Sequence, residues 1–166
     1  MASNGAYVYQ NGTLETDIRY DSIGKNSEVI AAGDVLTIAS GLVKVVAAAT
    51  DPILGVATKT ATMASNNQTV APIIYPGYIP AENSVFFMYT NADLTGNATN
   101  GGTYYGLTGG TGAVVVDVNG GVTSTTSKQV EIVKVDPRNI GGTGAGSGLR
   151  ECLVKFVRTP STISNA

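Results

Sequence analysis

Apolar and polar residues alternate in short runs along the whole chain. Segments rich in Val, Ile, Thr, Tyr and Phe are separated by clusters of Gly, Asn, Ser and Pro. This pattern is typical of short β-strands joined by turns. It predicts strands near residues 6–10, 35–39, 42–47, 53–59, 69–75, 85–90, 104–108, 113–118, 128–135 and 151–158. A helical period is hard to find, and we expect at most one or two helical turns, near residues 92–94 or 137–140.

The clearest predicted hairpin spans residues 34–46. Ser40-Gly41 separates two apolar runs there. Glycine tolerates the positive φ that a tight hairpin turn requires. The sequence therefore predicts a two-residue turn at this position.

Two of the predicted strands lack a clear polar face. Residues 113–116 read Ala-Val-Val-Val, which is apolar on both faces, and the faces of residues 128–135 are mixed. Strands that are apolar on both sides lie between two layers of a fold or at a subunit interface. The pattern is a first indication of an oligomer, and a central sandwich strand explains it nearly as well.

Length and loop composition indicate one domain. A chain of 166 residues suits one domain, or at most two small ones. The Gly-rich stretches at 95–102, 109–112 and 140–148 are interpreted as long loops between strands of that domain. We therefore expect an all-β protein, with a compact β-sandwich or β-barrel over residues 23–166. Residues 1–22 form an N-terminal arm or an edge strand in this interpretation.

Composition and charge narrow the function classes. The chain has 12 acidic and 10 basic residues, a net charge of −2 and no His. Nucleic acid is not an expected partner, because counterion-release binding needs a basic face. No run approaches the roughly 20 apolar residues of a membrane span, and the N-terminus resembles no secretion signal. We expect a chain that is made in a cytoplasm and has no membrane partner.

Candidate chemistry is sparse. The single Cys152 shares a predicted strand face with Val154 and Phe156, so we interpret it as a buried small hydrophobe. The Gly-rich run 144–148 is followed by Leu-Arg, whereas a phosphate-binding Walker loop needs Lys and then Ser or Thr. We expect no catalytic residue, no cofactor and no metal site. Four aspartates lie at turn-like positions, where such side chains bond the local backbone: Asp34, Asp51, Asp93 and Asp136.

The eight tyrosines are more informative. Tyrosine is frequent at protein interfaces, because it has an apolar body and a polar tip. It is equally ordinary on strands, so interface contact and plain strand packing stay equal alternatives. A sugar-binding aromatic platform is less favoured, since the chain has no Trp. The candidate interface residues are Tyr7, Tyr9, Tyr20, Tyr75, Tyr78, Tyr104 and Tyr105.

Several of these segments resemble a known family. The pieces are residues 31–36 (Ala-Ala-Gly-Asp-Val-Leu), 41–45 and 52–57 in the first half, and 102–107, 116–118, 130–137 and 154–157 in the second. The pieces of the first half resemble the small decoration, or cement, proteins of tailed-bacteriophage capsids, and those of the second half resemble capsid-associated phage proteins. The resemblance is one of strand and hairpin pattern, and it extends over about three-quarters of the chain.

The resemblance implies a structural role and no catalysis. It implies a β-rich domain that binds the major capsid protein on the outer face of an icosahedral shell and links neighbouring subunits, as a homotrimer. It places the chain on the exterior of the virion, after synthesis in the cytoplasm of the bacterial host. It also implies that residues 1–22 reach across to neighbouring capsomers.

Two further hypotheses stay open at this point. One is a carbohydrate- or receptor-binding β-module of a phage fibre or adhesin, in which Tyr104 or Tyr105 contacts the ligand. The other, ranked last, is a carboxylate-dependent hydrolase, which needs a clustered acid pair with one raised pKa in a pocket.

Overall fold

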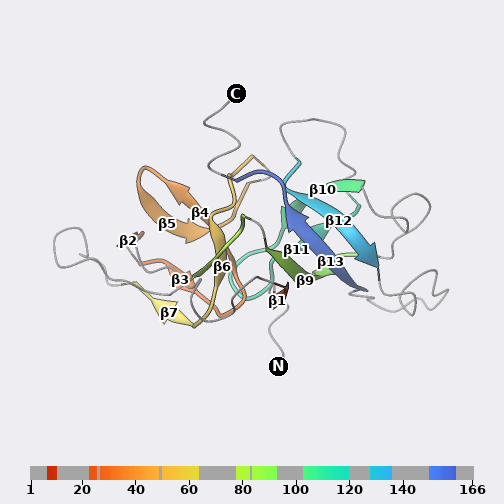
Figure 1. Cartoon of the computed structure of the whole chain (residues 1–166). Coiled ribbons are helices and arrows are strands. Elements are labelled where there is room, and N and C mark those ends of the chain that lie inside the picture. Colours follow the sequence, from red (N-terminus) through yellow and green to blue (C-terminus); the bar gives the residue numbers. More distant parts are fainter. Residues whose placement is uncertain are drawn as a thin grey trace.

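The fold is all-β. The computed structural model describes residues 7–10, 23–25, 27–48, 50–63, 78–82, 84–92, 103–119, 128–135 and 150–159. Every regular element within these ranges is a strand. No helix in the described part of the chain has the length and apolar character needed to cross a membrane. Figure 1 shows two groups of strands side by side, with the later strands forming a barrel on one side and the earlier strands two small sheets on the other.

The barrel is built from the second half of the chain. Its sheet has the order β1-β9-β11-β10-β12-β13, and β13 also pairs with β9. Five strands therefore close into a ring, and β1 is attached to β9 as an additional edge strand. The bounds are β1 Tyr7–Gln10, β9 Val85–Thr90, β10 Thr103–Thr108, β11 Val115–Asp117, β12 Val130–Val135 and β13 Arg150–Phe156.

A side chain reinforces the seam of the barrel. β9 and β11 are parallel there, and the register joins Thr90 to Val116. Asn91 follows β9, and its backbone N–H donates to the Val116 carbonyl (3.0 Å). Its side-chain oxygen accepts from the Val118 N–H (2.9 Å), and its amide nitrogen donates to Asp117 (2.7 Å). Asn91 thus continues the hydrogen bonding of the seam past the end of the strand.

The two small sheets come from residues 23–80. The larger has the order β2-β5-β4-β6-β8, and the smaller pairs β3 with β7. The predicted turn at Ser40-Gly41 is confirmed, since both residues have positive φ, of 52° and 77°. That geometry matches the tight hairpin turns that follow the twist of their strands. The bounds are β2 Ile23–Gly24, β3 Val29–Ile30, β4 Val35–Ala39, β5 Leu42–Val45, β6 Gly55–Ala57, β7 Ala61–Thr62 and β8 Tyr78–Pro80.

One hydrophobic core joins the barrel and the small sheets. The same cluster of buried side chains includes Leu36 and Val56 from the larger small sheet and Phe86, Met88 and Ile132 from the barrel. Buried and half-buried residues alternate along β9, because successive side chains of a strand point to opposite faces. The barrel and the small sheets therefore share their interior.

Most strand predictions are confirmed. The sequence predicted a β-sandwich or a β-barrel, and the structure shows a barrel. The bounds of β4 and β9 agree with the predicted 35–39 and 85–90. The sequence pattern missed β2, β3, β7 and β8, which have only two or three residues each. The predicted strand at 69–75 lies outside the described residues, as do the loops at 95–102 and 140–148. Of the predicted helical turns, 137–140 lies outside as well, and in 92–94 only Ala92 is described, as a bend.

The two-sided apolar strand has an explanation within one chain. Val114, Val115 and Val116 are all buried, and Val114 and Val116 belong to the shared core. The alternative of a central strand therefore accounts for this pattern without a subunit interface. The boundary between an arm and a domain at residue 22 stays a prediction, and β1 within that arm pairs with β9 of its own chain.

Candidate functional site

The structure separates the candidate tyrosines by position. Tyr78 and Tyr105 are buried in the shared core, so for these two residues plain strand packing is the alternative that the structure shows. Tyr7 and Tyr9 lie in β1, where Tyr7 is the register partner of Phe87. Their side chains, and the whole of Tyr20 and Tyr75, lie outside the described residues.

Tyr104 is half-buried on the outside of the barrel. The Lys128 ammonium lies 4.7 Å from the centre of its ring, which is a cation–π contact. Such contacts contribute about 0.5–1 kcal/mol at exposed sites. Glu131, on β12, is the register partner of Tyr104. The ring is therefore available for surface contact, but a lysine already covers one of its faces.

A second outward surface lies on β9 and β13, and we call it the β9–β13 face. It consists of the residues that alternate with the buried ones along these two strands. Tyr89 belongs to it, and Tyr89 is the one tyrosine that the sequence-based site prediction left out. The alternation of Val85–Thr90 was the signal that could have found it. The members are Val85, Phe87 and Tyr89 of β9 and Glu151, Leu153 and Lys155 of β13.

Cys152 is buried, as its strand pattern predicted. Its thiol donates to the Met88 carbonyl (3.4 Å). Burial, with a smaller contribution from the charge of Glu151, raises the pKa of the thiol to about 12. A nucleophilic cysteine needs the opposite shift, toward a thiolate near neutral pH. The side chain serves as core packing.

Asp34 is a buried carboxylate that joins two turns. One oxygen accepts from the Ala31 N–H in its own turn (2.7 Å), and the other accepts from the Gly112 N–H (2.7 Å), in the β10–β11 turn. Burial raises the pKa of Asp34, the two hydrogen bonds lower it, and the nearby charge of Glu28 raises it further. A raised carboxylate pKa was the expected mark of a hydrolase. Here it accompanies a carboxylate whose two oxygens both accept backbone hydrogen bonds.

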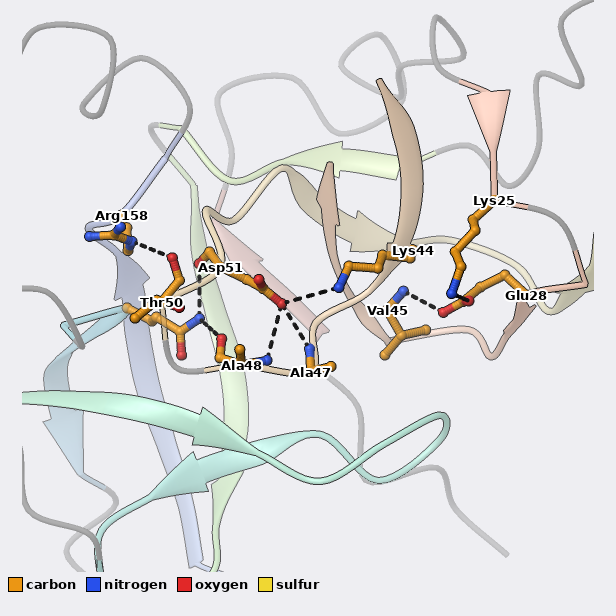
Figure 2. A network of polar contacts seen from close by, with 10 residues as sticks. Lys25, Glu28, Lys44, Val45, Ala47, Ala48, Thr50, Asp51 and Arg158 are labelled. Carbon is orange, nitrogen blue, oxygen red and sulfur yellow. Dashed lines mark hydrogen bonds and ion pairs between the residues drawn. The ribbon is translucent and has the colours of Figure 1, made fainter. Parts of the chain in front are cut away.

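A network of polar contacts runs along the surface of the small sheets (Figure 2). Asp51 accepts from the N–H groups of Ala47 and Ala48 (both 3.1 Å) and lies 3.7 Å from the Lys44 ammonium. Asp34 and Asp51 thus both bond the local backbone, as predicted for turn aspartates, while Asp93 and Asp136 lie outside the described residues.

The same network continues at both ends. Glu28 accepts from the Val45 N–H (2.9 Å) and lies 3.7 Å from Lys25, and Arg158 donates to the Thr50 carbonyl (2.9 Å) (Figure 2). Ion pairs at exposed positions contribute about 0–1 kcal/mol. The network fixes the course of the surface segments, and its acidic groups are occupied by backbone donors and lysines.

Gln129 is a polar residue that the sequence analysis did not single out. It is fully buried, and its side-chain oxygen accepts from the Leu107 N–H (2.8 Å). Its amide nitrogen donates to the carbonyls of Ala48 (3.1 Å) and Asp51 (2.9 Å). This side chain therefore links the barrel to the segment that follows β5. Within the described residues, no group of three or more His, Cys, Asp or Glu side chains is arranged to hold a metal ion.

Comparisons with protein-family models, with curated proteins and with solved structures found no match to this chain.

Proposed function

We propose that this chain is a virion structural protein that binds the outer surface of an icosahedral phage capsid and stabilises the shell by linking neighbouring capsid subunits. The main support is the way in which the segments behind the family resemblance assemble. Residues 31–36, 41–45 and 52–57 contribute the turn before β4 and the strands β4, β5 and β6, which are neighbours in one sheet. The later segments contribute β10, β11, β12 and β13 of the barrel.

The placement of the reactive groups also favours a binding role. Cys152 is buried, both oxygens of Asp34 accept backbone hydrogen bonds, and the Gln129 amide bonds three backbone groups. The described surface instead presents strand faces with Tyr104, Tyr89 and short-range charge pairs. Many identical weak contacts on a shell act together through multivalency, so no single strong site is required.

The proposal is tested on purified particles with and without the chain. We expect the protein in purified virions at stoichiometric occupancy, as density on the outside of the shell in a cryo-EM map. Particles lacking it should release their genome at lower temperature, and adding back the folded protein should restore the wild-type temperature. Heat-denatured protein is the control for the add-back. Absence from purified virions, together with unchanged heat resistance, would reject the proposal.

The competing carbohydrate- or receptor-binding role has a separate test. Tyr104 is its best-placed aromatic residue, because Tyr105 is buried. Under that role, Tyr104→Ala abolishes glycan binding on an array and Tyr89→Ala, a half-buried tyrosine on another strand, leaves it unchanged. The capsid role predicts no glycan binding by the wild-type protein. Trimeric assembly is implied by the resemblance alone, and sedimentation velocity on the purified chain would measure the number of copies.

A further inference from the structure

The β9–β13 face has an apolar centre between charges of opposite sign. In the register of the two strands, Leu153 lies beside Phe87, Glu151 beside Tyr89 and Lys155 beside Val85. Phe87 and Leu153 are half-buried although they point away from the shared core. Glu151 and Lys155 are each two residues from Leu153, which is about 7 Å along a strand. Glu151 and Lys155 therefore lie at equal distances on either side of Leu153 and carry opposite charges.

This arrangement is self-complementary in one orientation. Two identical sheet faces can pack face to face about a two-fold axis that lies between them. If the axis runs along the strands, Glu151 meets Glu151 of the second copy and Lys155 meets Lys155. If the axis runs across the strands at Leu153, each Glu151 faces Lys155 of the other copy. Like charges placed opposite one another are unfavourable, so the charges select the second orientation.

We propose that two copies of this chain associate through their β9–β13 faces, about a two-fold axis that passes across the strands at Leu153. The contact places the Leu153 and Phe87 side chains of both copies at its centre and two Glu151–Lys155 pairs at its ends. An apolar centre inside a charged rim is the usual composition of a specific interface. Glu131 is the register partner of Lys155 within one chain. In the proposed contact each Lys155 therefore has Glu131 of its own chain beside it and Glu151 of the second copy opposite it.

The neighbouring lysine marks the edge of the contact. Lys134 lies on β12 beside Leu153, after a register shift that leaves Val133 unpaired and exposed. Packed sheets are twisted and diverge away from their line of contact. In the proposed contact the two copies of Lys134 therefore lie one strand outside the Leu153 centre, at the rim. This inference is independent of the proposed function, because it concerns two copies of the chain in solution.

Sedimentation velocity on the purified full-length chain tests the pairing. The wild type should show concentration-dependent association from 16.9 kDa to twice that mass. Glu151→Lys and Lys155→Glu should each weaken self-association at least tenfold, because each places like charges at both ends of the contact. An equimolar mixture of the two variants should associate about as strongly as the wild type, since a face that carries two lysines then meets a face that carries two glutamates.

Controls keep the result tied to this face. Lys59→Glu makes the same change of charge as Lys155→Glu, at an exposed residue between β6 and β7. This variant should leave association unchanged. The double variant Glu151→Lys/Lys155→Glu should self-associate like the wild type. All variants should match the wild-type circular dichroism spectrum. A wild type that stays at 16.9 kDa, a trimer, or single variants that associate normally would each overturn the pairing, and none of these outcomes bears on the particle test.

Discussion

Gln129 shows how much one buried amide can contribute. A buried polar side chain is stabilising only where its donors and acceptors are all engaged, and this one bonds three backbone groups in two parts of the molecule. Its own backbone is also engaged, because its N–H donates to the Tyr105 carbonyl (3.0 Å) and its carbonyl accepts from the Val157 N–H (2.9 Å). The residue is therefore fixed at every polar atom.

Replacing Gln129 with Leu should lower the free energy of unfolding by about 2–4 kcal/mol. The apolar substitute preserves the volume but leaves the Leu107 N–H and the carbonyls of Ala48 and Asp51 without this partner, and an unsatisfied buried group costs about 1–3 kcal/mol. Urea unfolding monitored by circular dichroism measures the change. Lys134→Leu, an exposed position on β12, is the control and should shift stability by about 0.5 kcal/mol or less. Equal effects for the two variants would contradict the bridging role.

Cys152 makes the stability of the fold sensitive to alkali. Its pKa in the folded protein is about 12, above the ordinary value of a thiol in an unfolded chain, about 8.5. The contribution is therefore fully present below pH 8.5 and is lost as the pH rises toward 12, because only the unfolded chain gives up the proton. We expect Cys152 to account for a loss of about 1–2 kcal/mol between pH 8.5 and 10.

The comparison of wild type with Cys152→Ala isolates this effect, since the two proteins differ in no other titratable group. Urea unfolding at pH 8 and pH 10 should show a smaller loss for the alanine variant. Identical losses would mean that the thiol ionises as readily in the folded chain as in the unfolded one.

Among the elements, the turn before β4 and the β10–β11 turn are joined through Asp34. Gly112 has a positive φ of 73°, which turns its N–H toward the carboxylate in a conformation that favours glycine. Thr111 adds a hydrogen bond from its hydroxyl to the Val29 carbonyl (2.9 Å). Asp34 and Thr111 therefore tie the β10–β11 turn of the barrel to the part of the chain that forms the small sheets, in addition to the shared core.

Asp34→Ala should destabilise the fold by about 2–4 kcal/mol, since it leaves two backbone N–H groups without their partner. The Gly112 amide should also exchange with solvent faster, which hydrogen exchange followed by NMR would detect. Asp51→Ala removes a carboxylate with three partners at a half-buried surface position, and it should cost about 1 kcal/mol or less. An Asp51 variant that is as unstable as the Asp34 variant would show that burial is not the deciding factor.

The raised pKa of Asp34 has the opposite sign to most stabilising carboxylates. A group whose pKa is higher in the folded chain favours folding most below its unfolded pKa, and that contribution is lost as the pH rises through the folded value. The two backbone hydrogen bonds offset part of the cost of burying this charge, because they lower the pKa that burial raises.

At the scale of the whole molecule, the barrel and the small sheets share one core. Leu36 and Ile132 are fully buried in it, one from each part. Shared packing couples the two parts energetically, so neither is expected to unfold alone. We therefore expect the barrel and the small sheets to unfold as a single cooperative unit.

Leu36→Ala and Ile132→Ala should each lower the free energy of unfolding by about 2–5 kcal/mol, the usual cost of a large-to-small change in a core. Each should shift the same single transition, seen alike by tyrosine fluorescence and far-UV circular dichroism. Val29→Ala, at an exposed valine, is the control. Two separate transitions, or a Leu36 variant that affects only one probe, would show that the two parts unfold independently.

The sequence by itself determined the class of fold and the longer strands. The strand pattern of side chains extends over only five or six consecutive residues, so the sequence predicted the bounds of β4 and β9 to the residue. The turn at Ser40-Gly41 was equally local, because two residues with positive φ are enough to form it. The burial of Cys152 followed from the same alternation.

Tertiary structure alone decided the barrel, the short strands and the use of the polar residues. The pairing of β9 with β13 joins residues far apart in the chain, and strands of two residues such as β2, β3 and β7 exist only because a distant partner bonds them. Tyr104 and Tyr105 are neighbours in the sequence, yet Tyr105 is buried in the core and Tyr104 lies on the outside of the barrel. Contacts between distant segments decide which side of a strand faces the interior and which polar groups are buried. The free energy of these contacts cannot be inferred from a short stretch of sequence.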